Sequence, residues 1–196
     1  RIFNQRDFRI ALSIGIDRNR LQAGDPTVIP WQVAPLPESR YFHERLATQY
    51  LRFDPDEANR LLDGLSYRRG TDGVRRERGG APIAFAIICS AEEREAWLKV
   101  AAEDWRRLGV DISVQLLARE DYIRRVEANT FDAAAYPAEG GIDVTVNPSD
   151  FIPFGVQTAW GIRWWRWYQN PADPRAEVPP APVQRQFALY DRIKAT

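Results

Sequence analysis

The middle of the chain alternates between strand-like and helix-like spacing of its hydrophobic residues. Residues 81–89 form a nearly continuous apolar run, which predicts a buried strand. Residues 90–108 place Trp97, Ala101 and Trp105 on one helical face, and residues 110–116 alternate between apolar and polar side chains, as in a half-buried strand. This strand–helix–strand order predicts an α/β layer with right-handed crossovers where the strands are parallel.

Capping signals define the ends of two of the expected helices. Asp54, followed by Pro55, predicts the start of a helix that ends at Gly64. Ser90 and Glu93 have the spacing of a capping box, and Gly109 is typical of a helix stop.

The remaining segments are shorter or less regular. We expect a helix over roughly 5–17 with Asn4 as its cap, a short helix around 122–128, a small-residue strand at 132–136 and a last helix from Pro182. Val183, Phe187, Tyr190 and Ile193 form one side of that last helix. Proline-rich residues 23–37 are expected to be extended, and residues 142–180 to be loop-like.

Length and charge exclude several classes of protein. The 196 residues allow one domain or two small ones, and the net charge of zero gives no field that would favour nucleic acid. The single cysteine allows no disulfide within the chain, and no run reaches the roughly 20 apolar residues of a membrane span. Because no signal peptide and no methionine are present, we expect a fragment or a mature, truncated chain.

Candidates for metal binding and nucleophilic catalysis are weak. His43 is the single histidine and has no neighbouring ligands at metal spacing. Cys89 lies inside an expected strand, where a cysteine is a small core residue. Residues 71–75 lack the carboxylates of a calcium loop and are interpreted as a turn. We therefore expect no catalytic residue, no metal and no cofactor.

The most unusual local feature is an aromatic cluster between residues 160 and 168. It contains Trp160, Trp164, Trp165 and Trp167, four of the seven tryptophans, and shows no clear period. In a loop, such rings offer flat faces to sugars or peptide side chains. Packing between domains and a surface for a partner protein are the alternatives. The ligand-wall hypothesis selects Trp160, Arg163, Trp164, Trp167 and Tyr168.

A second candidate site follows the expected strand at 132–136. Glu139 and Asp143 flank two glycines just after the end of this strand, close to Tyr136, where α/β proteins commonly bind ligands. Three interpretations stay open: a glycine turn with solvated acids, hydrogen bonding to a ligand amine or hydroxyl, and the paired carboxylates of a glycan hydrolase.

Several stretches, in order, resemble the family 5 extracellular solute-binding proteins of ATP-binding-cassette importers. These are FRIALSIGIDR at 8–18, FDPDEANRLLD at 53–63, TDGVR at 71–75, AEDWRRLGVDISV at 102–114 and the tail at 177–196. The resemblance covers nearly the whole chain. It departs from the family pattern after Arg18 and after Asp63, where loops are shorter or residues are missing from the sequence.

This resemblance implies a periplasmic-binding-protein type II lobe with a mixed sheet flanked by helices, plus a partial return to the other lobe. Residues 1–145 would form the second lobe, and residues 146–196 the tryptophan-rich segment and terminal helix. It further implies a non-enzymatic, monomeric component that captures an oligopeptide or oligosaccharide and delivers it to a membrane permease. The implied location is periplasmic or extracellular, with membrane association through the permease or through a lipid anchor outside this chain. A hydrolase using Glu139 and Asp143, or a stand-alone interaction module, is the alternative.

Overall fold

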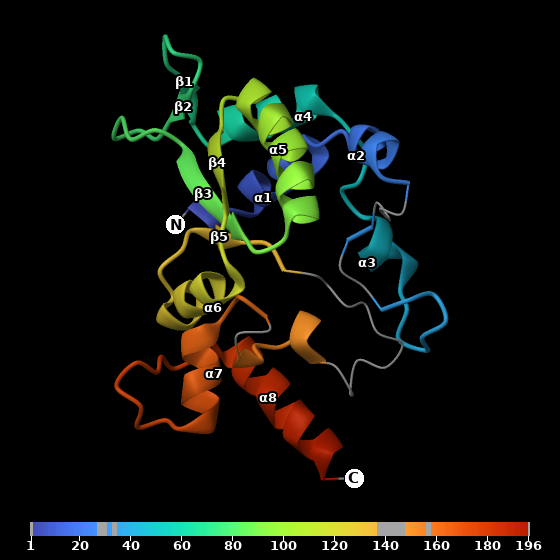
Figure 1. Ribbon diagram of the computed structural model, residues 1–196, viewed down its shortest axis with the longest axis vertical. Helices are drawn as coiled ribbons and strands as arrows, with labels where there is room; N and C mark the ends of the chain where they lie inside the picture. The colour runs from blue at the N-terminus through green and yellow to red at the C-terminus, as the bar shows by residue number, and fades with distance from the viewer. Residues whose placement is uncertain (1, 27–30, 33–34, 137–147, 156–157, 196) are drawn as a thin grey trace. The chain divides into compact units, whose positions relative to one another are not determined.

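The computed structural model describes residues 2–26, 31–32, 35–136, 148–155 and 158–195. Its residues divide into two compact units (Figure 1). Unit 1 comprises Arg1–Gln32 and Thr48–Leu117, and unit 2 comprises Val33–Ala47 and Ala118–Thr196. The expected boundary at residue 145 concerns the lobes of a longer protein, and it stays a prediction.

Unit 1 is built around two parallel strands and the helix that connects them. Strands β3 (Ala84–Cys89) and β4 (Asp111–Leu116) pair in parallel from Ala84↔Asp111 to Cys89↔Leu116. Helix α5 (Glu92–Arg107) joins them and packs on β4 (Figure 1). The expected strand–helix–strand order is therefore confirmed. The other elements of this unit are η1 (Ile2–Asn4), α1 (Arg6–Ile14), α2 (Arg18–Gly24), α4 (Pro55–Gly64), β1 (Arg68–Arg69) and β2 (Arg75–Arg76).

Hydrophobic burial holds this unit together. Helix α1 packs against α4, and its Phe8 is fully buried with Leu62 of α4. The side chains of Ile88, Leu108 and Ile112 are each about 1% exposed, which removes their apolar surface from water almost completely. A directional polar contact supplements this burial: the Trp105 indole of α5 donates a hydrogen bond to the Leu12 carbonyl of α1 over 2.8 Å.

Both ends of α5 test the expected capping signals. The prediction of a capping box at Ser90 and Glu93 is wrong. Ala91 is the N-cap of α5, and no side chain forms a capping hydrogen bond at this end. Three glutamates in the first turn instead place negative charge at the positive end of the helix dipole. The stop at Gly109 is confirmed: its φ is +84°, and its N–H donates to the Arg106 carbonyl.

The amino-terminal helical region is divided, contrary to the single helix expected over 5–17. Helix α1 ends at Ile14, and α2 starts a second helix at Arg18. Asp17 caps α2 by accepting from the Asn19 N–H, and its own N–H donates to the Asp104 carboxylate. Gly15 at the break lies so close to Leu108 that a Cβ there would be 2.4 Å from a side-chain carbon. Gly15 at the C-cap of α1 and Asp17 at the N-cap of α2 are local signals for this break that the expectation of one helix passed over.

The helix expected from Asp54 to Gly64 is confirmed as α4. The Asp54 carboxylate accepts from the Glu57 N–H, and this hydrogen bond is the main cause of its lowered pKa. In a complete capping box, the Glu57 side chain would also accept from the Asp54 backbone N–H. Here the Glu57 carboxylate pairs with Arg60 over 2.7 Å instead.

Unit 2 contains helices and irregular segments. Its elements are most of α3 (Glu44–Thr48), α6 (Arg119–Ala128), β5 (Ala133–Ala134), η2 (Pro148–Asp150), α7 (Ile162–Gln169) and α8 (Ala181–Lys194). The strand expected over 132–136 is present but short. Helix α8 carries Pro182 in its first turn and buries Val183 and Phe187, whereas Tyr190 is half-buried and Ile193 is exposed.

The prediction that residues 142–180 are loop-like is wrong for the centre of this segment. The aromatic run forms the helix α7, with Gly161 at its N-cap in the left-handed region at φ +62°. Its inward-facing residues Ile162, Trp165 and Tyr168 lie three residues apart, a spacing that keeps neighbouring side chains on one side of a helix. The flanking glycine and prolines concealed this spacing in the sequence.

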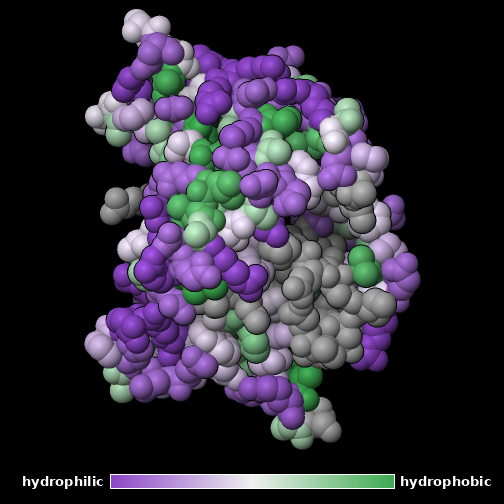
Figure 2. Space-filling view, in the orientation of Figure 1, coloured by the Kyte–Doolittle hydropathy of each residue, from purple (hydrophilic) through white to green (hydrophobic). Residues whose placement is uncertain are grey.

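Among the residues coloured in Figure 2, most are hydrophilic, and hydrophobic ones form small patches between them. Among the described residues, no helix is long and apolar enough to cross a membrane.

Candidate functional site

The tryptophan-rich helix α7 has two faces with different surroundings. On one face, the Trp165 ring lies 4.7 Å from Phe154 and 5.4 Å from Tyr168, measured between ring centroids. Tyr168 stacks on Phe187 of α8 at 4.4 Å. These rings are the aromatic core of unit 2. Packing therefore accounts for Trp165.

Tyr168 combines this packing with a polar contact to α8. Its hydroxyl is hydrogen-bonded to the Asp191 carboxylate, and it accepts from the Lys194 ammonium over 2.7 Å. Burial, together with the hydrogen bond to Asp191, raises the pKa of the Tyr168 hydroxyl. The assignment of Tyr168 to a ligand site stays a prediction.

The other predicted aromatic residues are more accessible. Trp160 is 37% exposed, while Trp164 and Trp167 are half-buried. Tyr136 is 39% exposed and stacks on Tyr122 of α6 with centroids 6.3 Å apart. Glu139 and Asp143 lie outside the described residues. Contact of these six residues with a ligand stays a prediction.

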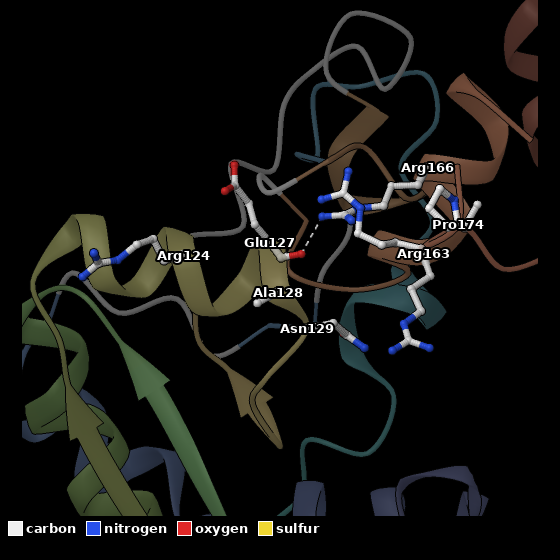
Figure 3. A pocket seen from close by; sticks show the side chains of 9 residues that line it. Arg124, Glu127, Ala128, Asn129, Arg163, Arg166 and Pro174 are labelled. Atoms are coloured by element: carbon white, nitrogen blue, oxygen red, sulfur yellow. Dashed lines mark hydrogen bonds between the residues drawn. The ribbon is translucent and has the colours of Figure 1, made fainter. Parts of the chain in front are cut away.

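Arg163 lines a pocket of about 580 Å³ within unit 2, between α6, α7 and the segment 174–176. Arg163 and Arg166 come from α7, and the end of α6 with Asn129 lies opposite them (Figure 3). Arg124 and Arg175 complete a lining that holds four arginines and one glutamate, Glu127.

Three of the four arginines already have protein partners. Arg166 donates to the Glu127 carbonyl over 2.7 Å, which satisfies an acceptor at the end of α6 (Figure 3). Arg175 forms a forked contact with Asp173, which lowers the pKa of that carboxyl, and Arg124 pairs with Asp121.

Arg163 differs from these three. Its side chain is exposed and has no hydrogen bond or ion pair within the described ranges. An unpaired guanidinium fork fits a carboxylate or another oxyanion.

Sequence reasoning found Arg163 but missed the rest of this pocket. Arg124, Arg166 and Arg175 come from three segments, and no local motif connects them. No group of three or more potential metal-binding side chains occurs among the described residues.

Comparisons with known proteins show which family this chain resembles. Residues 1–181 match the model of "Bacterial extracellular solute-binding proteins, family 5 Middle". A probable ABC transporter-binding protein of Deinococcus radiodurans is 28% identical over 99 residues, which cover 46% of this chain and 17% of that protein.

Solved structures agree over a longer stretch. An oligopeptide-binding protein OppA matches 100% of this chain and 33% of its own, with a TM-score of 0.88 and 26% identity. An oligopeptide-binding protein of Thermotoga maritima, solved with mannohexaose, matches 92% of this chain and 34% of its own, with a TM-score of 0.65 and 15% identity. The expected α/β fold of type II periplasmic binding proteins is thereby confirmed.

The chain spans about a third of the solved relatives' length and 17% of the curated one's. The family model, in contrast, matches nearly the whole of this chain. The chain therefore belongs to the bacterial extracellular solute-binding proteins of family 5.

Proposed function

We propose that this chain is part of a non-enzymatic solute-binding protein that captures an oligopeptide or oligosaccharide outside the cytoplasm. The complete protein would deliver its ligand to the membrane permease of an ABC importer. The observation that carries this proposal is the family match over residues 1–181. Similarity to OppA along the whole chain supports the peptide as ligand, and the mannohexaose complex of the Thermotoga relative supports the oligosaccharide.

The test uses the complete protein that contains this chain. Mass spectrometry of small molecules retained through purification identifies the ligand class, and calorimetry with matched peptides and oligosaccharides then measures affinity. Saturable binding without conversion of the ligand is the expected result. Release of shortened oligosaccharides would contradict the proposal and favour a hydrolase.

Arg163 offers a specific prediction within this proposal. If its fork binds a ligand carboxylate, Arg163→Gln lowers affinity for a peptide with a free carboxyl terminus by roughly 10- to 100-fold, since a hydrogen bond to a charged group contributes about 1.5–3 kcal/mol. The carboxyl-terminally amidated peptide should bind the wild type and the variant equally. Arg185→Gln, at an exposed position on α8, is the matched control. An equal loss for both peptides would exclude the carboxylate contact.

A further inference from the structure

The short hairpin β1–β2 of unit 1 places arginine opposite arginine in both of its cross-strand pairs. The register is Arg68↔Arg76 and Arg69↔Arg75. Like charges directly opposite each other destabilise a strand pair unless other groups compensate them. The two faces of the hairpin differ in how this compensation is achieved.

The inner face is compensated by the protein itself. Arg75 is 2% exposed and donates to the carbonyls of Leu108 and Tyr67 and to the carboxylate of Asp63. Arg69 donates to the carbonyls of Gly73 and Arg107. Burial and the nearby charge of Arg75 lower the pKa of Arg69. These two arginines are structural.

The outer face is compensated only in part. Because side chains alternate along a strand, Arg68 and Arg76 share the face opposite to Arg69 and Arg75. Arg76 pairs with Asp72 over 2.6 Å and donates to the Gly80 carbonyl over 3.2 Å. Arg78 lies two residues beyond the end of β2 and donates to the neutral hydroxyl of Ser66 over 3.2 Å. The Arg68 side chain is exposed and makes no hydrogen bond or ion pair within the part of the chain that the structure describes.

A pocket of about 520 Å³ lies at this hairpin. Arg68, Arg76 and Arg78 line it together with Glu77, and Arg69, whose guanidinium is already bonded to backbone carbonyls, reaches its edge from the other face. Gly70 allows the Arg76 guanidinium to approach the backbone closely, since a Cβ there would lie 2.9 Å from its Nε. The pocket therefore combines positive charge with forked donors held on a hydrogen-bonded hairpin.

We propose that the outer face of the β1–β2 hairpin binds a phosphate-class oxyanion, with Arg68 and Arg78 as its main contacts. Guanidinium groups match the oxygens of phosphate in pairs, and such charge-assisted hydrogen bonds are the stronger ones. Lys99 and Lys194 are the only lysines among the 27 basic residues, so forked donors dominate the positive charge of this protein. The phosphate belongs either to a soluble compound or to a lipid headgroup.

The experiment compares the complete protein with two double variants of equal charge. Arg68→Gln with Arg78→Gln removes the proposed contacts, and Arg45→Gln with Arg185→Gln removes two exposed arginines elsewhere. Calorimetry with inorganic phosphate probes the soluble source, and co-sedimentation with phosphatidylglycerol vesicles, against phosphatidylcholine vesicles, probes the headgroup. Both assays use about 50 mM salt, where such contacts are least screened.

Binding of phosphate by the wild type, weakened roughly 10- to 100-fold in the hairpin variant alone, supports a soluble ligand. The same pattern with phosphatidylglycerol vesicles alone supports a headgroup. No binding of either probe by the wild type, or an equal loss in the control variant, overturns the proposal. If the double variant unfolds, Arg68→Gln and Arg78→Gln are tested singly, and each should weaken phosphate or vesicle binding relative to the control variants. Peptide or oligosaccharide affinity should be unchanged in the hairpin variant, so this test and that of the proposed function fail independently.

Discussion

Arg75 is a charged residue that unit 1 uses as a structural centre. Its guanidinium is almost completely buried and meets two backbone carbonyls, the Asn59 side chain and Asp63. The opposing carboxylate of Asp63 is 66% exposed, so the ion pair is not sealed from water. The carbonyls of Tyr67 and Leu108 depend on Arg75 for these hydrogen bonds, and losing a donor is costly in a buried environment.

We expect Arg75→Met to lower the free energy of unfolding by about 2–5 kcal/mol, because both buried carbonyls lose a donor. Arg76→Met is the matched control on the adjacent residue. Arg76 pairs with Asp72 at the surface, so its loss should cost less than about 1 kcal/mol. Urea denaturation of the complete protein measures both changes. Equal losses would show that Arg75 is not a structural centre.

Gly109 follows Leu108, the C-cap of α5, at a position that favours glycine. Its φ of +84° is strained for residues with a Cβ. A Cβ there would also lie 2.8 Å from the Gly73 carbonyl oxygen, which belongs to the backbone and cannot move easily.

Gly109→Ala should therefore destabilise the protein by about 2–4 kcal/mol, from backbone strain and the steric clash together. At Gly64, the last residue of α4, a Cβ would meet no atom within 4 Å, and Gly64→Ala should be neutral or stabilising by up to about 1 kcal/mol. Thermal unfolding of the two variants compares them directly. A similar fall in melting temperature for both would contradict the role assigned to Gly109.

At the scale of elements, α7 shows why an aromatic run need not be a binding loop. Trp165 and Tyr168 point toward Phe154 and Phe187 and hold α7 and α8 together. Trp160 precedes the helix and is exposed. Residues of one short run thus have different surroundings, and a ligand-binding role for the accessible ones stays a prediction.

Single alanine variants separate these roles. Trp165→Ala should cost about 3 kcal/mol of stability through lost packing, and the protein that stays folded should bind ligand with unchanged affinity. Trp160→Ala should leave the melting temperature nearly unchanged, and should weaken binding about 2- to 10-fold if its ring stacks on the ligand.

Trp164→Ala and Trp167→Ala extend the same comparison to the two half-buried rings. Melting and affinity are measured for each variant. If the variants at positions 160, 164 and 167 all keep full affinity, the ligand-wall hypothesis is wrong.

At the scale of the whole molecule, this chain corresponds to about a third of its solved relatives. Proteins of this kind bind a ligand by closing lobes around it, so residues outside this chain should share the contacts. We expect the isolated 196-residue chain to bind ligand at least on the order of 100-fold more weakly than the complete protein, which corresponds to about 2.7 kcal/mol. Calorimetry on both proteins, after circular dichroism has shown that the chain is folded, measures this difference. Equal affinities would contradict the two-lobe interpretation.

The local sequence determined the elements whose signals are local. The apolar run before Cys89, the alternation in 110–116, the Asp54 cap and the Gly109 stop all predicted elements that the structure contains, because spacing and capping act within a few residues. The ordered motifs were sufficient to identify the family. Domain boundaries and ligand contacts are not fixed by such signals, and they stay predictions.

Tertiary structure decided the features that join distant segments. Gly15 packs so closely on Leu108 that a side chain would not fit there, and α7 is stabilised by rings from residues before and after it in the chain. The pocket beside Arg163 draws arginines from three segments, and the role of Arg75 depends on carbonyls at positions 67 and 108. Burial and charge compensation depend on which residues are close in space, and the spacing of residues along the sequence does not reveal this for distant segments.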